Sequence, residues 1–222
     1  MSNYYNFSGM GKPDIIALDG PVGSGKTTIG TMLSERLGYR FLDTGDLYRA
    51  LTLLVIRKGL RSEEDIVKLA RDFSPRIEGR RIFIGDEDVT ERLRDREVEE
   101  RIPFISRIKD VRSCLVKIQR REASGGRIIV AGRDIGTVVL PDADLKIYLD
   151  APLEERARRR YEEVKHKGMS YEEVLKSLKE RDEMDMKREV GPLKPADDAI
   201  IINTENKSPE EVLSEILSLM EV

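Results

Sequence analysis

The residues with the clearest chemical meaning form a glycine-rich segment near the start of the chain, Gly20-Pro21-Val22-Gly23-Ser24-Gly25-Lys26-Thr27. This segment matches the phosphate-binding pattern G-x-x-x-x-G-K-S/T in full. Glycines let backbone N–H groups approach phosphate oxygens, the lysine brings charge to the β- and γ-phosphates, and the threonine hydroxyl can ligate Mg²⁺. The segment, extended to Thr28, therefore predicts a site for a nucleoside triphosphate.

The flanking sequence supplies the elements that such a loop requires. An apolar run, Ile15 to Leu18, precedes it and predicts a buried parallel strand. Ile29, Leu33 and Leu37 follow it on one face of a predicted helix that Gly38 ends. Because strand, loop and helix occur in the right order, a glycine-rich turn that binds nothing is the less favoured alternative.

The rest of the chain predicts an α/β fold of the three-layer P-loop NTPase type. Strands are expected at 40–42, 128–131, 145–149 and 199–202, and helices between them give a five-stranded parallel sheet with right-handed crossovers. Residues 76–89 show period-two runs broken by Gly and Asp, which predict a small antiparallel sheet in a lobe inserted at about 60–105. The segment 98–105 reads as a helix that Pro103 interrupts.

Composition narrows the classes of function. A net charge of −3 argues against broad nucleic-acid binding, and no apolar stretch approaches the roughly 20 residues that span a membrane. A lone Cys114, expected at a buried apolar position, fits a reducing compartment, and a single His166 disfavours zinc sites and Ser-His-Asp triads. We expect a cytoplasmic monomer, with residues 1–13 as a loose extension and no nucleic-acid or membrane partner.

A second group of charged residues follows the predicted triphosphate loop. Several arginines at strand and helix ends indicate a second anionic ligand, hence a phosphorylated acceptor and a small-molecule kinase. The run 154–160 allows two interpretations, a solvated helix with i,i+4 ion pairs or a mobile source of arginines for phosphoryl transfer. The group comprises Arg49, Arg112, Arg133, Asp134, Arg181, Asp185 and Arg188.

Several motifs together resemble bacterial cytidylate kinases from about Ile15 to the end of the chain. The most specific is Gly132-Arg133-Asp134-Ile135-Gly136-Thr137-Val138-Val139. The others are Gly20 to Thr28, Leu42-Asp43-Thr44-Gly45 with Tyr48-Arg49, Pro141-Asp142-Ala143, 146–151, Arg181-Asp182 through Asp185 to Arg188, and 192–199.

The resemblance implies transfer of the γ-phosphoryl group of ATP, with Mg²⁺ on Thr27, to CMP or dCMP. It implies that Lys26, Arg133, Arg160 and Arg181 act in catalysis. It places Thr44, Arg112, Asp134 and Arg188 around the cytosine, with Tyr48 also in the acceptor pocket. Asp185 and Arg181 would face the ribose, and Arg49 and Arg133 would clamp the monophosphate. It also implies one kinase domain with a core (14–59, 106–151, 190–222), a monophosphate-binding insert (60–105) and a lid (152–189).

Two positions depart from the family pattern, and other acceptors stay open. Ala131 stands where an acidic residue that could hold a Mg²⁺-bound water is usual, and Pro103 stands where a hydroxyl side chain is common. UMP, dTMP or a shikimate-type alcohol are the alternative acceptors. A nucleotide-binding regulatory protein without turnover is the alternative from another class.

Overall fold

The computed structural model describes residues 12–165 and 168–220, so most of the expected extension at 1–13, together with His166, lies outside the described residues. The chain divides into two compact units. The first comprises Met1–Arg40 and Gly126–Val222, and the second comprises Phe41–Gly125. No helix of the described residues is long and apolar enough to cross a membrane.

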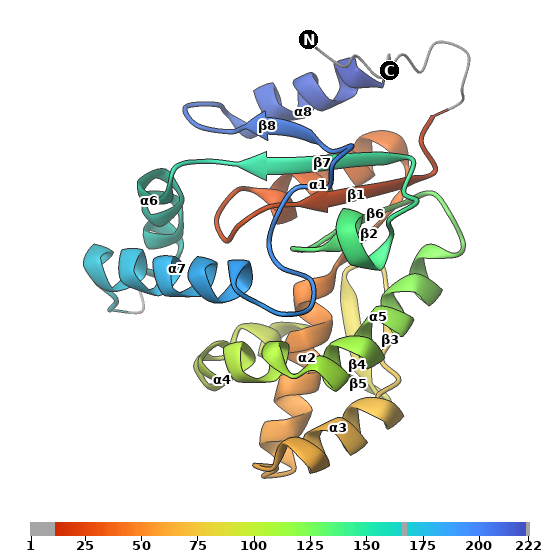
Figure 1. Ribbon diagram of the computed structural model, residues 1–222, viewed down its shortest axis with the longest axis vertical. Helices are drawn as coiled ribbons and strands as arrows, with labels where there is room; N and C mark the ends of the chain where they lie inside the picture. The colour runs from red at the N-terminus through yellow and green to blue at the C-terminus, as the bar shows by residue number, and fades with distance from the viewer. Residues whose placement is uncertain (1–11, 166–167, 221–222) are drawn as a thin grey trace. The chain divides into compact units, whose positions relative to one another are not determined.

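A five-stranded sheet contains the phosphate-loop strand at its centre (Figure 1). Its order is β2-β6-β1-β7-β8, and β1 pairs in parallel with β6 and β7. Apolar side chains such as Ile16, Leu18 and Ile129 are fully buried, which explains why these runs lack polar alternation. The five predicted strands are confirmed as β1 (Ile15–Asp19), β2 (Arg40–Asp43), β6 (Ile128–Ala131), β7 (Leu145–Asp150) and β8 (Ile200–Asn203).

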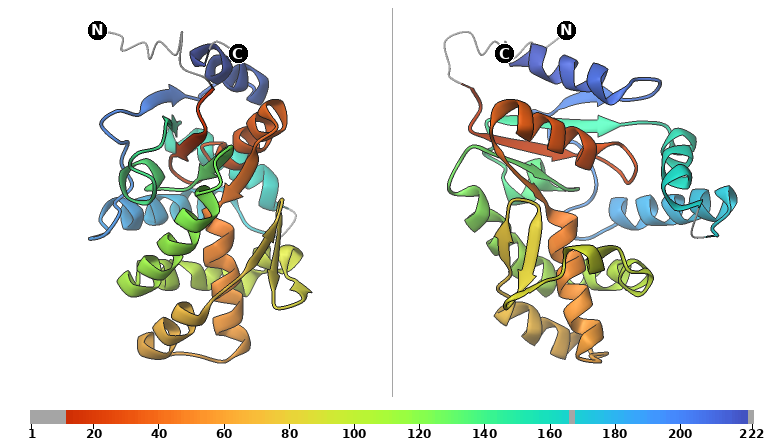
Figure 2. Two further views of the ribbon diagram at one scale, coloured as in Figure 1. Left: turned by 90° about the vertical axis from the view of Figure 1, so that its right-hand side faces the viewer. Right: turned by 180° about the vertical axis from the view of Figure 1, so that it is seen from behind.

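Two helices of the first unit lie beside each other, α1 (Lys26–Leu37) and α8 (Pro209–Leu219) (Figure 2). Helix α1 packs on β1 and β6 and ends at Gly38, whose left-handed φ of 68° fits the predicted cap. Helix α8 begins with Pro209 after Ser208, and Ser208 and Glu211 form a capping box.

Helices α6 (Leu153–Val164) and α7 (Tyr171–Met186) pack as a pair in the first unit (Figure 1). Ala157 and Val164 of α6 bury a small apolar cluster with Val174 and Leu178 of α7. The outer faces carry most of the charged residues, as expected for an amphipathic helix pair.

The second unit combines helices with a three-stranded antiparallel sheet, as predicted for 76–89. This unit is wider than the lobe expected at 60–105, because α2 packs on α4 and on β4, and α5 packs on α3. Its elements are α2 (Thr44–Arg57), α3 (Glu63–Asp72), β3 (Arg76–Glu78), β4 (Arg81–Ile84), β5 (Glu87–Asp88), the 3₁₀ turn η1 (Thr90–Arg94), α4 (Arg96–Arg107) and α5 (Lys109–Ala123).

The expectation that Pro103 interrupts its helix is wrong. Helix α4 continues through Pro103 to Arg107. A proline inside a helix loses one backbone hydrogen bond, but Val98, Ile102 and Ile105 bury one face of α4. Burial of that apolar face holds the helix together across the missing bond.

Candidate nucleotide-binding site

The phosphate-loop glycines adopt backbone conformations that other residues rarely reach. Gly20, Gly23 and Gly25 have φ of 147°, 78° and 95°. A Cβ at Gly20 would collide with the carbonyl of Leu149, and one at Gly23 would press on the backbone of Arg156. Gly25 is the N-cap of α1 and offers no side-chain cap, so the first N–H groups of the helix face the loop. The backbone thus forms the concave, amide-lined shape that a phosphate group fits.

Lys26 and Thr27 begin helix α1 inside this loop. Lys26 is 9% exposed, and its Nζ donates to the Pro21 carbonyl at 2.6 Å and to Ser24 Oγ at 3.4 Å. These hydrogen bonds hold the ammonium group against the loop, where it could bind the phosphates of a triphosphate. Thr27 is partly buried and Thr28 is exposed.

A magnesium ion fits this loop only as a companion of the nucleotide. Among residues 12–165 and 168–220, no three His, Cys, Asp or Glu side chains gather closely enough to hold a metal. Ala131 is buried and contributes no oxygen from its side chain. The Thr27 hydroxyl could serve as one direct ligand, and phosphate oxygens and water, which Mg²⁺ prefers to keep, would complete the shell.

Three arginines of the first unit cluster around one aspartate. Asp185 on α7 is the centre of this arginine cluster, since Arg133 Nε donates to Asp185 Oδ2 at 3.2 Å and Arg181 Nε donates to the same oxygen at 3.4 Å. Arg188 Nη1 lies 3.5 Å from Asp185 Oδ1, and Arg188 Nη2 lies 3.9 Å from Asp134 Oδ1. The structure therefore brings together five predicted acceptor residues that are far apart in the sequence.

The side chain of Asp185 is 3% exposed, and opposing effects act on the pKa of its carboxyl. Burial by itself would raise the pKa of the Asp185 carboxyl. The guanidinium groups of Arg181, Arg133 and Arg188 outweigh that effect and lower the pKa instead. Asp185 is thus an anion that holds three arginines in a fixed array.

The segment Gly132-Arg133-Asp134 sits at the carboxyl end of β6, followed by a π-helical turn at Ile135–Val139. Asp19, the last residue of β1, accepts N–H groups from Ile135 at 2.8 Å and Gly136 at 2.7 Å. Sequence reasoning missed Asp19. The sequence feature that could have identified Asp19 is a carboxylate at the end of an apolar run, directly before Gly20.

The remaining predicted acceptor residues belong to the second unit. Thr44, Tyr48 and Arg49 lie on α2, and Arg112 lies on α5 with its guanidinium 5.9 Å from the centre of the Tyr48 ring. Arg49 Nε donates to Glu99 Oε1 at 2.8 Å, and Arg49 Nη1 also pairs with Asp46 at 3.4 Å. Thr44, Tyr48 and Arg112 are all buried within this unit.

Acidic neighbours of Arg49 were not predicted either. Arg94 Nη2 lies 3.0 Å from Asp46 Oδ1 and Arg94 Nη1 lies 3.9 Å from Glu99 Oε1. Burial, with help from the Asp43 charge, raises the pKa of Asp46 to about 6. A phosphate that approached Arg49 would have to compete with these carboxylates for its guanidinium.

The arginines of α6 have different environments. Arg156 is 6% exposed and donates to the carbonyls of Ala151 at 2.8 Å and Val22 at 3.1 Å. It also pairs with Asp182 of α7 at 2.7 Å. Arg158 and Arg160 form helix-surface pairs with Glu155 and Glu163, and Arg159 donates to the Thr204 carbonyl at 2.6 Å. Arg160 lies at the partly exposed surface of α6, whereas Arg156 ties α6 and α7 to the phosphate loop.

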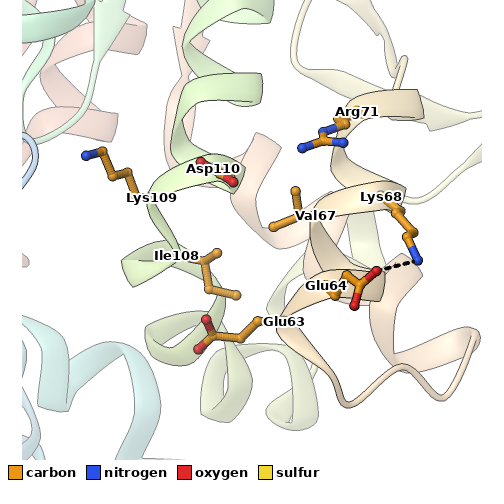
Figure 3. A pocket seen from close by; sticks show the side chains of 8 residues that line it. All are labelled: Glu63, Glu64, Val67, Lys68, Arg71, Ile108, Lys109 and Asp110. Carbon is orange, nitrogen blue, oxygen red and sulfur yellow. Dashed lines mark ion pairs between the residues drawn. The ribbon is translucent and has the colours of Figure 1, made fainter.

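A separate hollow of about 500 Å³ lies between α3 and the start of α5 in the second unit (Figure 3). Val67 and Ile108 form its apolar floor, and charged side chains surround it, including the ion pair of Lys68 with Glu64 at 2.8 Å. None of the predicted nucleotide or acceptor residues lines it. The hollow is therefore a different feature from the candidate site.

Comparison with known proteins assigns the chain to a family. The family model described as cytidylate kinase matches residues 16–222, which include the phosphate loop, the Gly132–Val139 segment and the arginine cluster. The chain belongs to the cytidylate kinase family. A cytidylate kinase of Caldanaerobacter subterraneus is 47% identical over 205 residues, covering 90% of this chain and 92% of that protein. A cytidylate kinase of Thermotoga maritima is 46% identical over 210 residues, covering 92% and 96%.

Solved structures extend the likeness at the level of the fold. A shikimate kinase from Acinetobacter baumannii, solved with shikimate, has a TM-score of 0.51 and 19% identity, covering 97% of this chain and 95% of that one. Its fold agrees with the predicted P-loop architecture that this member of the cytidylate kinase family shares with other small-molecule kinases.

Proposed function

We propose that this protein transfers the γ-phosphoryl group of ATP to CMP or dCMP, giving ADP and CDP or dCDP. The observation that supports this most directly is the arginine array around Asp185, in the same compact unit as the amide-lined phosphate loop. Membership of the cytidylate kinase family adds independent support for the acceptor.

The phosphate loop would hold the donor. The backbone N–H groups of 22–27 bind the phosphates, and Lys26 neutralises charge on the β- and γ-oxygens. Thr27 would hold Mg²⁺, which when bound neutralises phosphate charge and orients the phosphoryl group. Arg160 on α6 supplies a further guanidinium to the transferring group, exchanging its partner Glu163 for phosphate.

The arginine cluster would hold the acceptor. Arg133 would bind the acceptor phosphate and Arg181 would face the ribose, and Asp134 with Arg188 would offer an acceptor–donor pair to the cytosine edge. The proposal also assigns acceptor binding to four residues of the second unit, with Arg49 for the monophosphate and Thr44, Tyr48 and Arg112 for the base. Because a monophosphate is already anionic near neutral pH, the reaction needs positioning and charge neutralisation more than a general base.

A coupled ADP-release assay over a panel of acceptors tests the proposal. With Mg²⁺ and ATP present, CMP or dCMP should stimulate ADP release most, ahead of UMP, dTMP, AMP and shikimate. Greatest stimulation by another acceptor would reassign the substrate. ATP binding without stimulation by any acceptor would favour a regulatory protein over an enzyme.

A further inference from the structure

Asp19 is a buried carboxylate at the junction of the two halves of the candidate site. It ends β1 and directly precedes Gly20, the first residue of the phosphate loop, and it is 4% exposed. A charged group is costly to bury, so its hydrogen bonds must compensate. Each oxygen has a partner, since Oδ1 accepts the Ile135 N–H and Oδ2 accepts the Gly136 N–H.

These N–H groups belong to the turn that directly follows Asp134. The first N–H groups of a helical turn have no partner within it. No side chain of the turn's own N-cap, Asp134, binds them, and the Asp19 carboxylate does so from another strand. The Gly132 N–H also donates to the Leu18 carbonyl at 3.0 Å, so main chain and side chain both tie this segment to the end of β1.

The turn at Gly136 packs closely against Lys146 and Asp19. A Cβ on Gly136 would lie 3.1 Å from Lys146 Cδ and 3.5 Å from Asp19 Oδ2. A side chain at this position would therefore force Lys146, whose Nζ is held by Asp198 at 2.7 Å, or the turn itself to shift by a few tenths of an ångström.

The residues just before the turn point into the arginine cluster. Arg133 bonds Asp185, and Asp134 lies beside Arg188. A shift of the turn would carry both side chains with it, while Gly20 at the other end of the contact stays on the sheet.

We propose that Asp19 is a positioning residue, which fixes Arg133 and Asp134 at the distance from the phosphate loop that the acceptor nucleotide requires. This inference rests on the proposed function. Asp19 touches neither nucleotide, so its effect on the reaction passes through the Ile135 and Gly136 amides.

The carboxylate is needed because it accepts at both oxygens. An asparagine in its place would accept one N–H and turn its own NH₂ toward the other. The charged and titratable groups that act on Asp19 are Lys26, Asp134 and the cross-strand neighbour Tyr148.

The test compares Asp19→Asn with Asp144→Asn in steady-state kinetics. Asp144 is a matched control, since its Oδ2 accepts the N–H groups of Asp14 and Ile15 at 2.9 and 2.8 Å at the opposite, exposed end of β1. Asp19→Asn should raise the KM for CMP about tenfold, the effect of one lost charge-assisted hydrogen bond, and leave the KM for ATP within about twofold. Asp144→Asn should change neither KM.

A second variant, Gly136→Ala, keeps the carboxylate and instead crowds the turn that donates to it, because the added Cβ would lie 3.1 Å from Lys146 Cδ. Gly136→Ala should show the same selective rise in the KM for CMP. If Asp19→Asn does not fold, the kinetics of Gly136→Ala test the role of Asp19. Unchanged KM values for CMP, or equal losses for ATP and CMP, in the folded variants would overturn the role of Asp19. If the wild-type protein releases no ADP with CMP, the proposed function fails and the role of Asp19 falls with it.

Discussion

Asp185 remains negatively charged in a place where burial opposes ionisation, because three guanidinium groups face it. Asp185 in turn positions the arginines, because each guanidinium group pairs with this buried carboxylate. At the residue scale, the arginine array is therefore preorganised within the first unit, before any nucleotide binds.

Arg188 provides a test of this array. Arg188→Met removes the guanidinium between Asp134 and Asp185, so CMP affinity should fall about a hundredfold, as expected for one member of a buried charged pair. ATP affinity should change little, because Arg188 lies outside the phosphate loop that is proposed to bind ATP. Calorimetric titration with each nucleotide measures both, and Arg158→Met, which removes an exposed helix pair, is the control. Equal losses for the two nucleotides would contradict the placement of Arg188 at the base.

Asp19 predicts a dependence of stability on pH. Burial raises its pKa from 3.8 to about 6, and two amide hydrogen bonds only partly oppose that rise. An acid whose pKa is higher in the folded state stabilises the fold fully below its ordinary pKa, and this contribution is lost as the pH rises through about 6.

The free energy of unfolding of the wild-type protein, relative to Asp19→Asn, should therefore increase as the pH falls from about 7 to about 4. The full increase would be about 3 kcal/mol for a shift of this size. Urea unfolding at several pH values measures it. The comparison between variants removes the contribution of Asp46, whose pKa is raised in the same way. A difference that stays constant with pH would show that Asp19 titrates at its ordinary value.

At the element scale, the strands could be predicted because each is an apolar run that the sheet buries on both faces. The capping boxes and Gly38 could be predicted because the interactions that define them are local in sequence. Pro103 could not be judged from its own neighbours, since burial of the Val98–Ile105 face decides whether the helix continues. The contact from Asp19 to the 135–136 amides spans more than a hundred residues, and no local pattern reports it.

Pro103 lies inside α4, so Pro103→Ala should stabilise the protein. Alanine restores a backbone N–H and favours the helix by about 3 kcal/mol over proline. The loss of proline also increases the conformational entropy of the unfolded chain, which offsets about 1 kcal/mol of this gain. The melting temperature should rise by several degrees, at roughly 2–4 °C per kcal/mol for a chain of this size.

Pro209→Ala is the matched control, because Pro209 occupies the first turn of α8, where its missing N–H has no intrahelical partner. Its melting temperature should stay within about 1 °C of the wild type or fall slightly. A destabilised Pro103→Ala variant would mean that the pyrrolidine ring itself packs usefully against the second unit.

At the scale of the whole molecule, the described residues contain no acidic or thiolate cage for a metal, so magnesium should enter with the nucleotide. Treatment with EDTA should abolish CMP-dependent ADP release, and excess Mg²⁺ should restore it. The melting temperature without nucleotide should be unaffected by EDTA, whereas ATP should stabilise the protein more in the presence of Mg²⁺. A melting temperature that falls on chelation alone would reveal a structural metal site.

The buried side chain of Arg156 has a consequence for how the chain opens locally. Its guanidinium bonds the Val22 carbonyl of the phosphate loop and the Asp182 carboxylate in the second half of α7. Unfolding that part of α7 alone would leave a charged group buried without its anion, so it should require opening of the phosphate loop as well. Backbone amides near Asp182 should therefore exchange with solvent deuterium almost as slowly as those of α1. The part of α7 that carries Arg181 and Asp185 is in this respect anchored to the phosphate loop through the side chain of Arg156.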